Sequence, residues 1–418
     1  METLPFMKAE IITIGDELLL GQVIDTNSAW LGQELNALGI HVHFKTAVSD
    51  DEQAILDTLK LASNRSSIII MTGGLGPTRD DITKHTLCRF FNTHLVLNQE
   101  VLSFVKEIFT KRNLPMLESN NQQAMLPAIA DVLWNRSGTA PGMWFDQNNT
   151  IYISMPGVPF EMKTIFSEEV IPKLKSRFSF PSIIHRTLQT CSIGESFLAK
   201  KIEHIENQLP SNIKLAYLPA VGSVRLRFSA YGNDETLLKE SLNEIIAKLY
   251  NEIGQYIYAE GEVSLSETIG KLLKAKGKTL ATAESCTGGF LAHQITLTPG
   301  SSAYFLGSVI AYHNSIKQNE LHVSSTTLKE HGAVSEACVL EMAQAIRKKT
   351  GADYGLSTSG IAGPDGGTDA KPVGTVWIGF ASETKSFAKV FNMGDNRERT
   401  ILRTALMAMD ILRKELID

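Results

Sequence analysis

The sequence lacks the long apolar runs and the one-sided charge that mark membrane proteins and nucleic-acid-binding proteins. No apolar run is long enough to span a bilayer, and the N-terminal stretch does not have the pattern of a secretory signal. The formal net charge is −5, so the strongly basic surface that nucleic acids require is not expected. We therefore expect a cytoplasmic protein that binds neither membranes nor nucleic acids.

Cysteine is also scarce. The four cysteines, Cys88, Cys191, Cys286 and Cys338, form no C-x-x-C pair and lack zinc-ligand spacing, which indicates free thiols in a reducing compartment. Cys88 and Cys338 fall in amphipathic helical patterns and are predicted to fill the core. Cys286 differs, because it follows Ser285 at a predicted helix start, where the pKa of a thiol can be lowered. From the residues alone, both Ser285 and Cys286 are candidate nucleophiles.

The remaining composition is that of an ordinary globular chain. With 418 residues, 43% hydrophobic and 20% charged, it has material for two to four domains. Strand and helix patterns alternate from Lys8 to about Pro172, which predicts a doubly wound α/β domain. Between about 182 and 258 the pattern changes to that of a small α+β domain. We expect boundaries at 1–175, 176–260 and 261–418, the last part being a second α/β domain.

The most informative stretch runs from Ala283 to Gly289, where a short apolar run meets a predicted helix. A hydroxyl or thiol at such a junction lies beside unpaired backbone N–H groups that can stabilise an oxyanion or bind a phosphate. The groups concerned here are those near Thr287, Gly288 and Gly289. This arrangement is typical of acyl transfer, although an ordinary N-cap and tight turn has the same residues.

A second segment supplies a basic side chain. The apolar run Phe305–Ala311 predicts a buried strand that ends at Tyr312, and Lys317 follows five residues later. Active sites of open α/β sheets lie at such strand ends. A partly dehydrated Lys317 could accept the proton of Ser285 or stabilise a tyrosinate that does so. The alternative is a solvated helix lysine beside an aromatic residue at the edge of the core.

Two further segments suit anion binding. Residues 357–368 hold several closely spaced glycines, which let backbone amides approach an anion or a flat ring, although a surface loop has the same composition. Just before the final predicted helix, Arg397 and Arg399 lie where backbone N–H groups and guanidinium groups favour a phosphate. Both arginines could equally be solvated.

Five ordered motifs of this last domain resemble the nicotinamide-nucleotide amidase domain of the CinA (competence/damage-inducible) family. They are Glu284–Gly289, Tyr312 with Lys317, Gly332–Ser335, Ser359–Gly367 and Lys371–Trp377. The resemblance implies hydrolysis of nicotinamide mononucleotide to nicotinate mononucleotide and ammonia, without a metal. It makes Ser285 the nucleophile, assisted by Tyr312 and Lys317. We expect the substrate to be bound by residues of these motifs and of the last helix: Thr287, Gly288, Gly289, Ser359, Gly360, Ala362, Gly363, Arg397 and Arg399.

The N-terminal third carries a separate signal. The apolar runs Lys8–Ile14 and Ser67–Met71 predict strands that lead into Gly15-Asp16-Glu17-Leu18 and into the glycine-rich loop Thr72–Asp81. Such turns suit a phosphate or pyrophosphate, and the neighbouring acids suit a divalent cation that bridges phosphates.

These segments, with Thr26-Asn27-Ser28, follow one another as in the molybdopterin-binding fold, and Pro156–Met162 resembles the CinA branch of it. The resemblance implies metal-dependent cleavage of ADP-ribose, and Asp81 falls on the catalytic aspartate of the molybdopterin-inserting relatives. No Nudix-like Arg-Glu-x-x-Glu-Glu pattern is present. The expected metal ligands are Asp16, Asp50 and Asp81, with the register between Asp50 and Asp51 left open. The expected substrate-binding residues are Asn27, Thr72, Gly73, Gly74 and Gly76.

The middle domain is KH-like in this family. Here it lacks the Gly-x-x-Gly loop that clamps a nucleic-acid backbone, and Arg225 with Arg227 makes too small a basic patch, so a spacer or assembly role is expected. The whole sequence thus predicts a cytoplasmic, homodimeric, bifunctional hydrolase that salvages by-products of NAD. A non-catalytic competence adaptor and an N-terminal domain that binds or transfers a molybdopterin precursor are the alternatives.

Overall fold

A computed structural model describes residues 7–76, 78, 81–111, 115, 121–178, 180 and 182–417. The chain divides into two compact units, one made of residues up to Ile183 with Tyr231–Glu235, the other of Ile184–Ala230 with Thr236–Asp418. Within the described ranges, no helix is long and apolar enough to cross a membrane.

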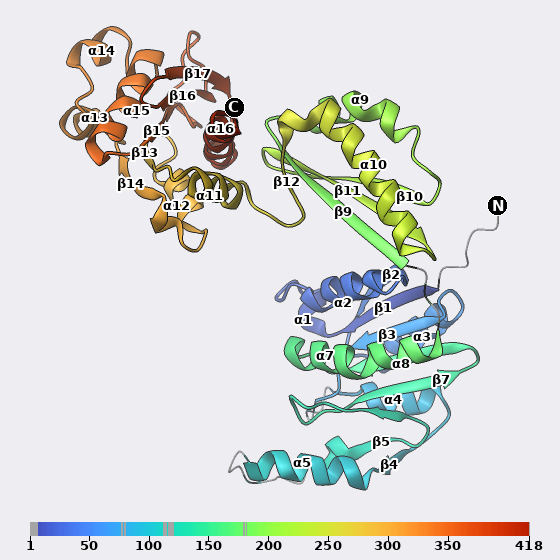
Figure 1. Ribbon diagram of the computed structural model, residues 1–418. Helices are drawn as coiled ribbons and strands as arrows, with labels where there is room; N and C mark the ends of the chain where they lie inside the picture. The colour runs from blue at the N-terminus through green and yellow to red at the C-terminus, as the bar shows by residue number, and fades with distance from the viewer. Residues whose placement is uncertain are drawn as a thin grey trace. The chain divides into compact units, whose positions relative to one another are not determined.

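The first unit is a doubly wound α/β domain, as predicted (Figure 1). Its sheet has the order β2-β1-β3-β8-β7-β6, in which β2, β1, β3 and β8 are parallel and β7 pairs antiparallel with both β8 and β6. The strands are β1 Lys8–Ile14, β2 His41–Val48, β3 Ile68–Thr72, β6 Asp131–Leu133, β7 Gly142–Gln147 and β8 Thr150–Met155, with a separate pair β4 Leu95–Leu97 and β5 Met125–Pro127.

Helices cover both faces of this sheet, because its central strands are apolar on both sides. α2, α7 and α8 pack on one face with Leu31 and Met162 in their core, while α3 and α4 pack on the other with Leu59 and Leu87. The helices are α1 Asp16–Leu19, α2 Thr26–Ala37, α3 Glu52–Ser63, α4 Thr83–Phe90, α5 Gln99–Lys111, η1 Gln122–Ala124, α7 Pro159–Ile165, η2 Phe166–Val170 and α8 Ile171–Arg177.

The second unit begins with a small α+β section. Its sheet has the order β10-β11-β9-β12, and α9 and α10 pack on one face of it around a single apolar cluster. In this sheet Val224, Leu226 and Phe228 are buried, whereas Arg225 and Arg227 between them are only partly buried. The elements are β9 Ser182–Cys191, α9 Glu195–Glu206, β10 Ile213–Ala220, β11 Ser223–Gly232, α10 Glu235–Ile253, η3 Gly254–Tyr256 and β12 Ile257–Glu260.

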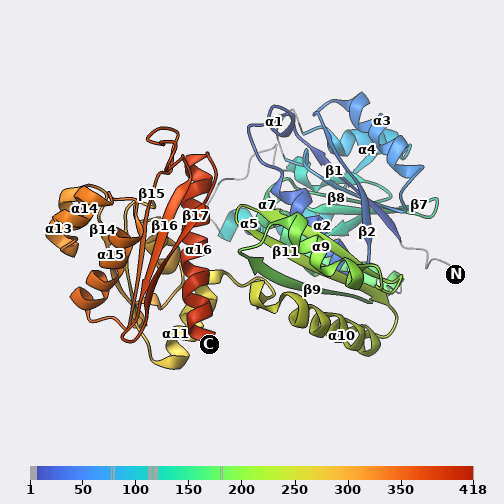
Figure 2. The same ribbon diagram turned by 90° about the horizontal axis from the view of Figure 1, so that it is seen from above.

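The C-terminal section is a three-layer α/β/α structure (Figure 2). Its sheet has the order β14-β13-β15-β16-β17, with β14, β13 and β15 parallel. α11, α12 and α16 pack on one face, and α13 and α15 on the other. The elements are α11 Leu265–Lys276, β13 Leu280–Glu284, α12 Phe290–Thr296, η4 Ser301–Ala303, β14 Phe305–Ile310, α13 Asn314–Leu321, α14 Ser325–Glu330, α15 Glu336–Thr350, β15 Tyr354–Gly360, β16 Thr375–Ala381, β17 Ser386–Asn392 and α16 Arg397–Ile417.

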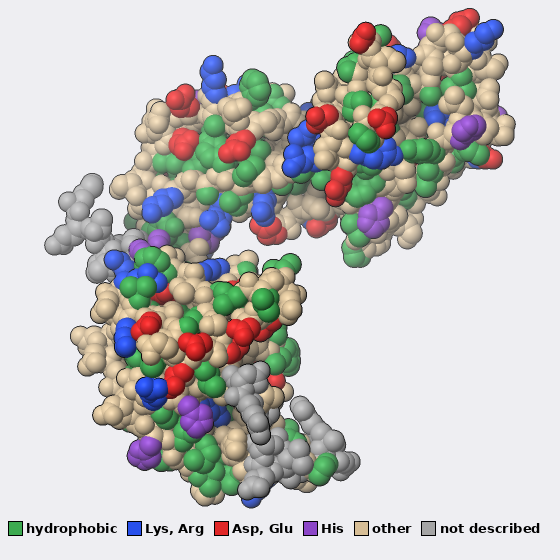
Figure 3. Space-filling model, turned by 180° about the vertical axis from the view of Figure 1, so that it is seen from behind, with side chains coloured by type: hydrophobic (Ala, Val, Ile, Leu, Met, Phe, Trp, Pro, Cys, Tyr) green, Lys and Arg blue, Asp and Glu red, His purple; other side chains and the backbone are tan. Residues whose placement is uncertain are grey.

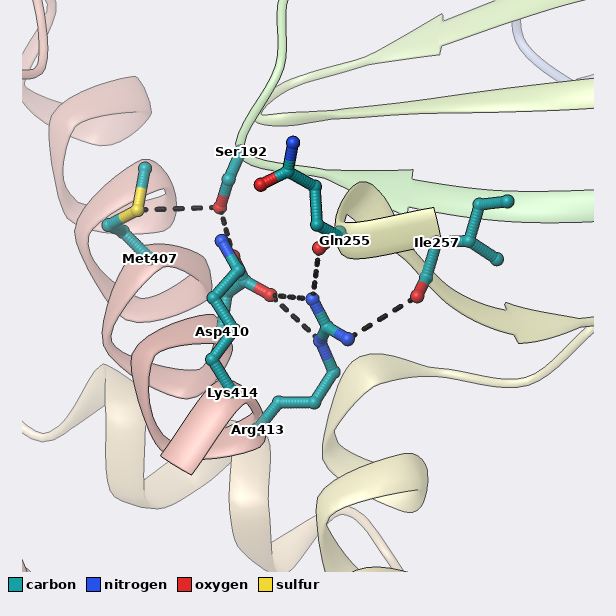
Figure 4. A network of polar contacts seen from close by, with 7 residues as sticks. All are labelled: Ser192, Gln255, Ile257, Met407, Asp410, Arg413 and Lys414. Carbon is teal, nitrogen blue, oxygen red and sulfur yellow. Dashed lines mark hydrogen bonds and ion pairs between the residues drawn. The ribbon is translucent and has the colours of Figure 1, made fainter. Parts of the chain in front are cut away.

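A buried polar network joins α16 to the middle section (Figure 4). Arg413 Nε donates to Asp410 at 2.8 Å, and Arg413 Nη2 donates to the Gln255 carbonyl at 2.7 Å. Ser192 Oγ donates to Asp410 at 2.5 Å. Burial opposes ionisation of Asp410, but Arg413, Lys414 and Ser192 outweigh it and lower its pKa. The two sections are therefore joined by hydrogen bonds that a buried ion pair within α16 makes to Ser192 and to the Gln255 and Ile257 carbonyls.

Two expectations about strands need correction. Phe305–Ala311 was expected to be a buried strand, but β14 lies at the edge of its sheet, and several of its residues are only partly buried. Ser357–Gly360 was expected to begin a loop, but these residues extend β15, because Thr358 and its neighbours pair with β13 and β16. The glycine-rich loop therefore starts later than the composition indicated.

Candidate functional site

Ser285 lies directly after the last residue of β13, between the ends of two parallel neighbours. Its N–H donates to the Thr358 carbonyl at 2.9 Å, which ties it to β15. The chain then turns through Gly288 and Gly289, whose φ angles are +59° and +97°. These are left-handed conformations that side chains other than glycine rarely adopt, so the two glycines allow the tight turn into α12.

Lys317 brings its amine to this serine. Nζ lies 3.0 Å from Ser285 Oγ, 2.7 Å from the Ala311 carbonyl and 3.2 Å from the Tyr312 carbonyl. The side chain is 1% exposed, and its burial lowers the pKa of the amine below that of an ordinary lysine. Strand β14 and helix α13 thus place a buried amine against the hydroxyl, which excludes the solvated-lysine alternative.

Glu284, the residue before the serine, organises the turn. Its carboxylate is fully buried and accepts hydrogen bonds from Thr287 Oγ1 at 2.7 Å and from the N–H groups of Gly289, Leu291 and Ala292 at 3.0, 3.0 and 2.8 Å. A carboxylate at a helix N-terminus is favoured by the helix dipole as well as by these bonds. The first amides of α12 are therefore already satisfied.

This arrangement changes the expected oxyanion site. The Gly289 N–H donates to Glu284, and the Gly288 N–H donates to the Ser285 carbonyl at 3.1 Å. Of the three amides expected to serve, only that of Thr287 has no partner within the described residues. The Thr287 side chain is buried and bonded to Glu284 and Thr358.

The thiol of Cys286 lies in the apolar core next to Ser285. It is 6% exposed and packs in the apolar cluster of α11, α12 and α16. Burial raises the pKa of this thiol to about 12. A thiol that stays protonated is a poor nucleophile, so the geometry favours Ser285 over Cys286.

The Tyr312 phenol does not contact Ser285 or Lys317. Its side chain is 58% exposed, and its hydroxyl accepts a hydrogen bond from Arg397 Nη2 at 2.8 Å. Only the backbone carbonyl of Tyr312 reaches Lys317, because the end of β14 directs this carbonyl inward and the ring outward. A tyrosinate stabilised by Lys317 is therefore not the arrangement observed.

Arg397 links this tyrosine to the glycine-rich segment. Its Nη1 donates to the Gly363 carbonyl at 2.9 Å. Ser359, in contrast, donates to the Ala333 carbonyl and is buried, as is Ala362, and a Cβ on Gly360 would lie 2.8 Å from the Thr375 carbonyl. Arg399 is exposed, and its N–H donates to the Asn396 side chain, which caps the start of α16. Of these residues, Arg397 and Gly363 lie beside Tyr312, whereas Ser359 and Gly360 have packing roles.

The N-terminal candidate residues surround a cavity of about 420 Å³. Gly73, Gly74 and Gly76 line it together with Asp50 and Asp81. Thr72 and Asn27 line an adjoining smaller cavity of about 120 Å³. Pro77, Arg79 and Asp80 of the expected loop lie outside the described residues.

The expected acidic residues are distributed in two groups. Asp16 and Asp50 bond reciprocally, each carboxylate accepting the other's N–H, at 3.1 and 3.3 Å. Asp81 accepts from the N–H groups of Gly76 and Thr78 at 2.7 and 2.8 Å. Asp51 caps α3 by accepting from Ala54, so Asp50 is the one that faces the cavity. Across the described ranges, no three His, Cys, Asp or Glu side chains group closely enough to hold a metal by themselves.

Sequence reasoning missed the roles of two carboxylates. Glu284 was part of a quoted motif, and its position just before a nucleophile at a helix start was an available signal. Glu161 lines the N-terminal cavity and accepts from Asn135 at 2.6 Å. A Cβ on Gly138 would lie 2.3 Å from a Glu161 oxygen, so a larger residue there would displace the Glu161 carboxylate. The local sequence pattern gave no sign that Glu161 contacts Asn135 and Gly138, which are more than 20 residues away in sequence.

The surface agrees with the modest charge of the chain. On the face drawn in Figure 3, lysine and arginine side chains are interspersed with aspartate and glutamate side chains. In the middle section, Arg225 pairs with Glu262 and Arg186 with Glu260. These basic residues are partly neutralised, which does not favour a nucleic-acid surface.

Comparison with known proteins identifies all three parts. Residues 10–176 match the family described as "Probable molybdopterin binding domain", 185–259 the "Damage-inducible protein CinA KH domain" and 262–416 the "CinA C-terminal domain". A CinA-like protein of Cytophaga hutchinsonii is 50% identical over 408 residues, 98% of each chain. A CinA-like protein of Flavobacterium psychrophilum is 45% identical, over 98% of this chain and 99% of that one. A CinA-like protein of Dictyoglomus thermophilum is 40% identical, over 99% of this chain and 100% of that one. The chain therefore belongs to the CinA family and combines a molybdopterin-binding-like domain, a KH-like domain and a CinA C-terminal domain.

Proposed function

We propose that the C-terminal domain is an amidohydrolase that converts nicotinamide mononucleotide to nicotinate mononucleotide and ammonia, with Ser285 as nucleophile and Lys317 as general base. The observation that carries the proposal is the 3.0 Å separation of Lys317 Nζ from Ser285 Oγ in a buried setting. Covalent acyl transfer requires a nucleophile and a base within hydrogen-bond reach of each other, with the base held in place by further groups.

The contacts of Lys317 suit a neutral amine. Such an amine has two N–H groups and one lone pair, and the two N–H groups can donate to the carbonyls of Ala311 and Tyr312. The lone pair then faces Ser285 and can accept its proton. Burial favours this uncharged form over the ammonium form.

The reaction follows from these positions. Lys317 takes the proton of Ser285 as Oγ attacks the carboxamide carbon, and the Thr287 N–H donates to the oxyanion that forms. Lys317 then gives its proton to the departing nitrogen, which leaves as ammonia, and an ester on Ser285 remains. A water, deprotonated by Lys317, hydrolyses this ester and restores the serine. None of these steps needs a metal.

The phosphate of the nucleotide suits Arg397. Its guanidinium lies beside Tyr312 and the glycine-rich segment, and it is exposed on the side where Tyr312 is exposed. Arginine binds phosphates through paired N–H donors. We assign Arg397, and not Arg399, to the phosphate.

Ammonia release from nicotinamide mononucleotide tests the proposal. The unaltered chain should release ammonia in the presence of a chelator, and Ser285→Ala should lower the rate by about 10⁴-fold or more. A chain that releases no ammonia, although it melts cooperatively, would support the competence-adaptor alternative instead. Thiol alkylation that stops the reaction while Ser285→Ala preserves it would make Cys286 the nucleophile.

For the N-terminal domain we propose hydrolysis of the pyrophosphate bond of ADP-ribose. The supporting observation is the cavity, in which glycine-rich backbone lies next to Asp50, Asp81 and Glu161. Glycine-rich turns suit the phosphates, and a cavity of this size suits a nucleotide. Cleavage of ADP-ribose by the unaltered chain, and its loss in Asp50→Asn, would support this activity. Binding of a molybdopterin precursor without hydrolysis of ADP-ribose would favour the alternative.

A divalent cation fits this cavity only when the phosphates of a bound substrate complete its coordination. Magnesium commonly uses one or two carboxylates together with substrate phosphates, and Asp50 and Asp81 can supply these two. Asp16, expected as a third ligand, is not among the residues that line this cavity. When bound, the cation would neutralise charge on the phosphates. The glycine-rich loop would orient the same phosphates through its N–H groups.

A further inference from the structure

A buried lysine anchors one wall of the N-terminal cavity. Lys84 lies in the first turn of α4 and is 7% exposed. Its Nζ donates to the carbonyls of Gln122 and Gln123 at 3.3 and 3.0 Å. These two bonds fix the short turn η1 against α4. The backbone of Gln123 is therefore held in place at the wall of the cavity.

The side chain of Gln123 lines the cavity but is unsatisfied. Gln123 is 1% exposed, and its Oε1 finds no hydrogen-bond partner among the residues that the structure describes. A buried acceptor without a donor costs free energy, and such groups in native proteins call for an explanation. A ligand that brings a donor to this wall supplies one.

A second unsatisfied acceptor lies in the adjoining small cavity. The two cavities share Ile14, Glu17 and Gly157 in their linings. In the smaller one, Asn27 Nδ2 donates to the Gly157 carbonyl at 2.7 Å, which fixes the amide, while Oδ1 has no partner within the described ranges. Two carbonyl oxygens that only accept thus lie near one glycine-rich loop.

The chemistry of these acceptors selects a class of ligand. An amide oxygen cannot bond to a phosphate oxygen, since both are acceptors, but it bonds to a hydroxyl group. The glycine-rich loop, in contrast, offers N–H donors that suit phosphate. We propose that Gln123 Oε1 accepts a hydrogen bond from a sugar hydroxyl of a nucleoside-diphosphate ligand, that Asn27 Oδ1 accepts from a hydroxyl on the other side of the phosphates, and that Lys84 positions Gln123. This assignment rests on the proposed N-terminal function and names the groups that select its substrate.

The test compares a ligand with hydroxyl groups and one without. The full chain, Gln123→Met and Gln122→Met are titrated with ADP-ribose and with inorganic pyrophosphate by calorimetry, at the same magnesium concentration. Gln122 is the matched control, because it is the adjacent residue and its side chain is exposed. Gln123→Met should weaken ADP-ribose binding about tenfold and leave pyrophosphate binding unchanged, and Gln122→Met should change neither. The melting temperature of Gln123→Met without ligand should equal or exceed that of the unaltered chain, because Oε1 has no hydrogen bond to lose among the residues that the structure describes.

Several results would overturn this assignment. They are unchanged ADP-ribose binding in Gln123→Met, an equal loss for pyrophosphate, or a clear fall in the melting temperature without ligand, which would indicate a structural bond. ADP-ribose that does not bind the unaltered chain would overturn both this assignment and the proposed N-terminal function. ADP-ribose that binds, with the predicted loss in Gln123→Met, but is not hydrolysed would remove the hydrolase proposal alone.

Discussion

Lys317 in the C-terminal domain and Lys84 in the N-terminal domain are built alike but have different neighbours. Both are buried, both have a pKa lowered by burial, and both donate to the carbonyls of two consecutive residues. Lys317 also reaches the hydroxyl of Ser285, whereas Lys84 bonds only to backbone carbonyls among the described residues. Burial and a lowered pKa therefore do not by themselves identify a catalytic base.

The elements that hold the two lysines explain this difference. Lys317 lies in α13, the helix that follows β14. The parallel neighbour of β14 is β13, which ends next to Ser285, so the adjacent strand ends bring the amine and the hydroxyl together. Lys84 lies in the first turn of α4, which packs on η1, a short turn remote in sequence. Its amine donates hydrogen bonds to two carbonyls of that turn. The proposed role of the first amine is proton transfer, whereas the second amine holds the backbone of a cavity wall in place.

Substitution by methionine is expected to lower the rate of deamidation at Lys317 and to leave it unchanged at Lys84. Lys317→Met should lower kcat/KM for nicotinamide mononucleotide by about 10³-fold, because general-base catalysis is lost. Lys84→Met removes a lysine of similar burial in the other unit and should leave this rate unchanged. Ammonia release by the two variants gives the result. Equal losses would mean that both substitutions act through general instability.

Removing the middle section should destabilise the C-terminal domain without removing its chemistry. A fragment that begins at Ile184 keeps the partners of Asp410 and Arg413, while one that begins at Glu262 loses Ser192 and the carbonyl of Gln255. Hydrogen bonds to charged groups contribute about 1.5–3 kcal/mol each, so the shorter fragment should be less stable by about 3 kcal/mol. Chemical denaturation of both fragments measures this. Equal stability would show that the network contributes nothing measurable.

Lys84 should make stability depend on pH in the alkaline range. Burial lowers its pKa from 10.5 to about 8, with Asp81 opposing the shift. Between these values the unfolded chain binds more protons than the folded chain, so the free energy of unfolding should rise with pH, by roughly 1–3 kcal/mol. Below pH 8 this contribution is constant. Lys84→Met should remove the rise, and a denaturation series from pH 7.5 to about 10.5 on both chains is the measurement. The same slope in both chains would contradict the assignment.

Cys286→Ala should have the smallest effect. The thiol fills apolar space next to Ser285, so its loss should cost about 1 kcal/mol of stability and change deamidation less than about twofold. Ammonia release and thermal melting measure the two quantities. A loss approaching that of Ser285→Ala would reassign the nucleophile.

Much of the fold was predictable because the apolar patterns are local. The strand predicted over Lys8–Ile14 has these bounds in the structure, and the one predicted over Ser67–Met71 differs from β3 by one residue at each end. Ile310, by contrast, was placed in a buried strand but lies in an edge strand. Strand order depends on pairing between distant segments, which an apolar run does not encode.

The site was predictable where residues follow strand ends, and not where it depends on side-chain direction. Ser285 and Lys317 were found because parallel strands end at one edge of a sheet. The outward direction of the Tyr312 ring and its bond to Arg397 depend on how α16 packs, which no spacing reveals. Gln123 was missed because a single glutamine between two short elements carries no periodic signal.

The pH dependence of deamidation tests the central claim, that Lys317 is the base for Ser285, most directly. For the unaltered chain, kcat/KM for nicotinamide mononucleotide should rise with pH through a pKa below that of an ordinary lysine, because burial favours the neutral amine. In Lys317→Met the residual rate should lack this rise, while in Lys84→Met the rise should be unchanged. A rise that persists at the same pH in Lys317→Met would contradict the account and leave Lys317 a structural residue.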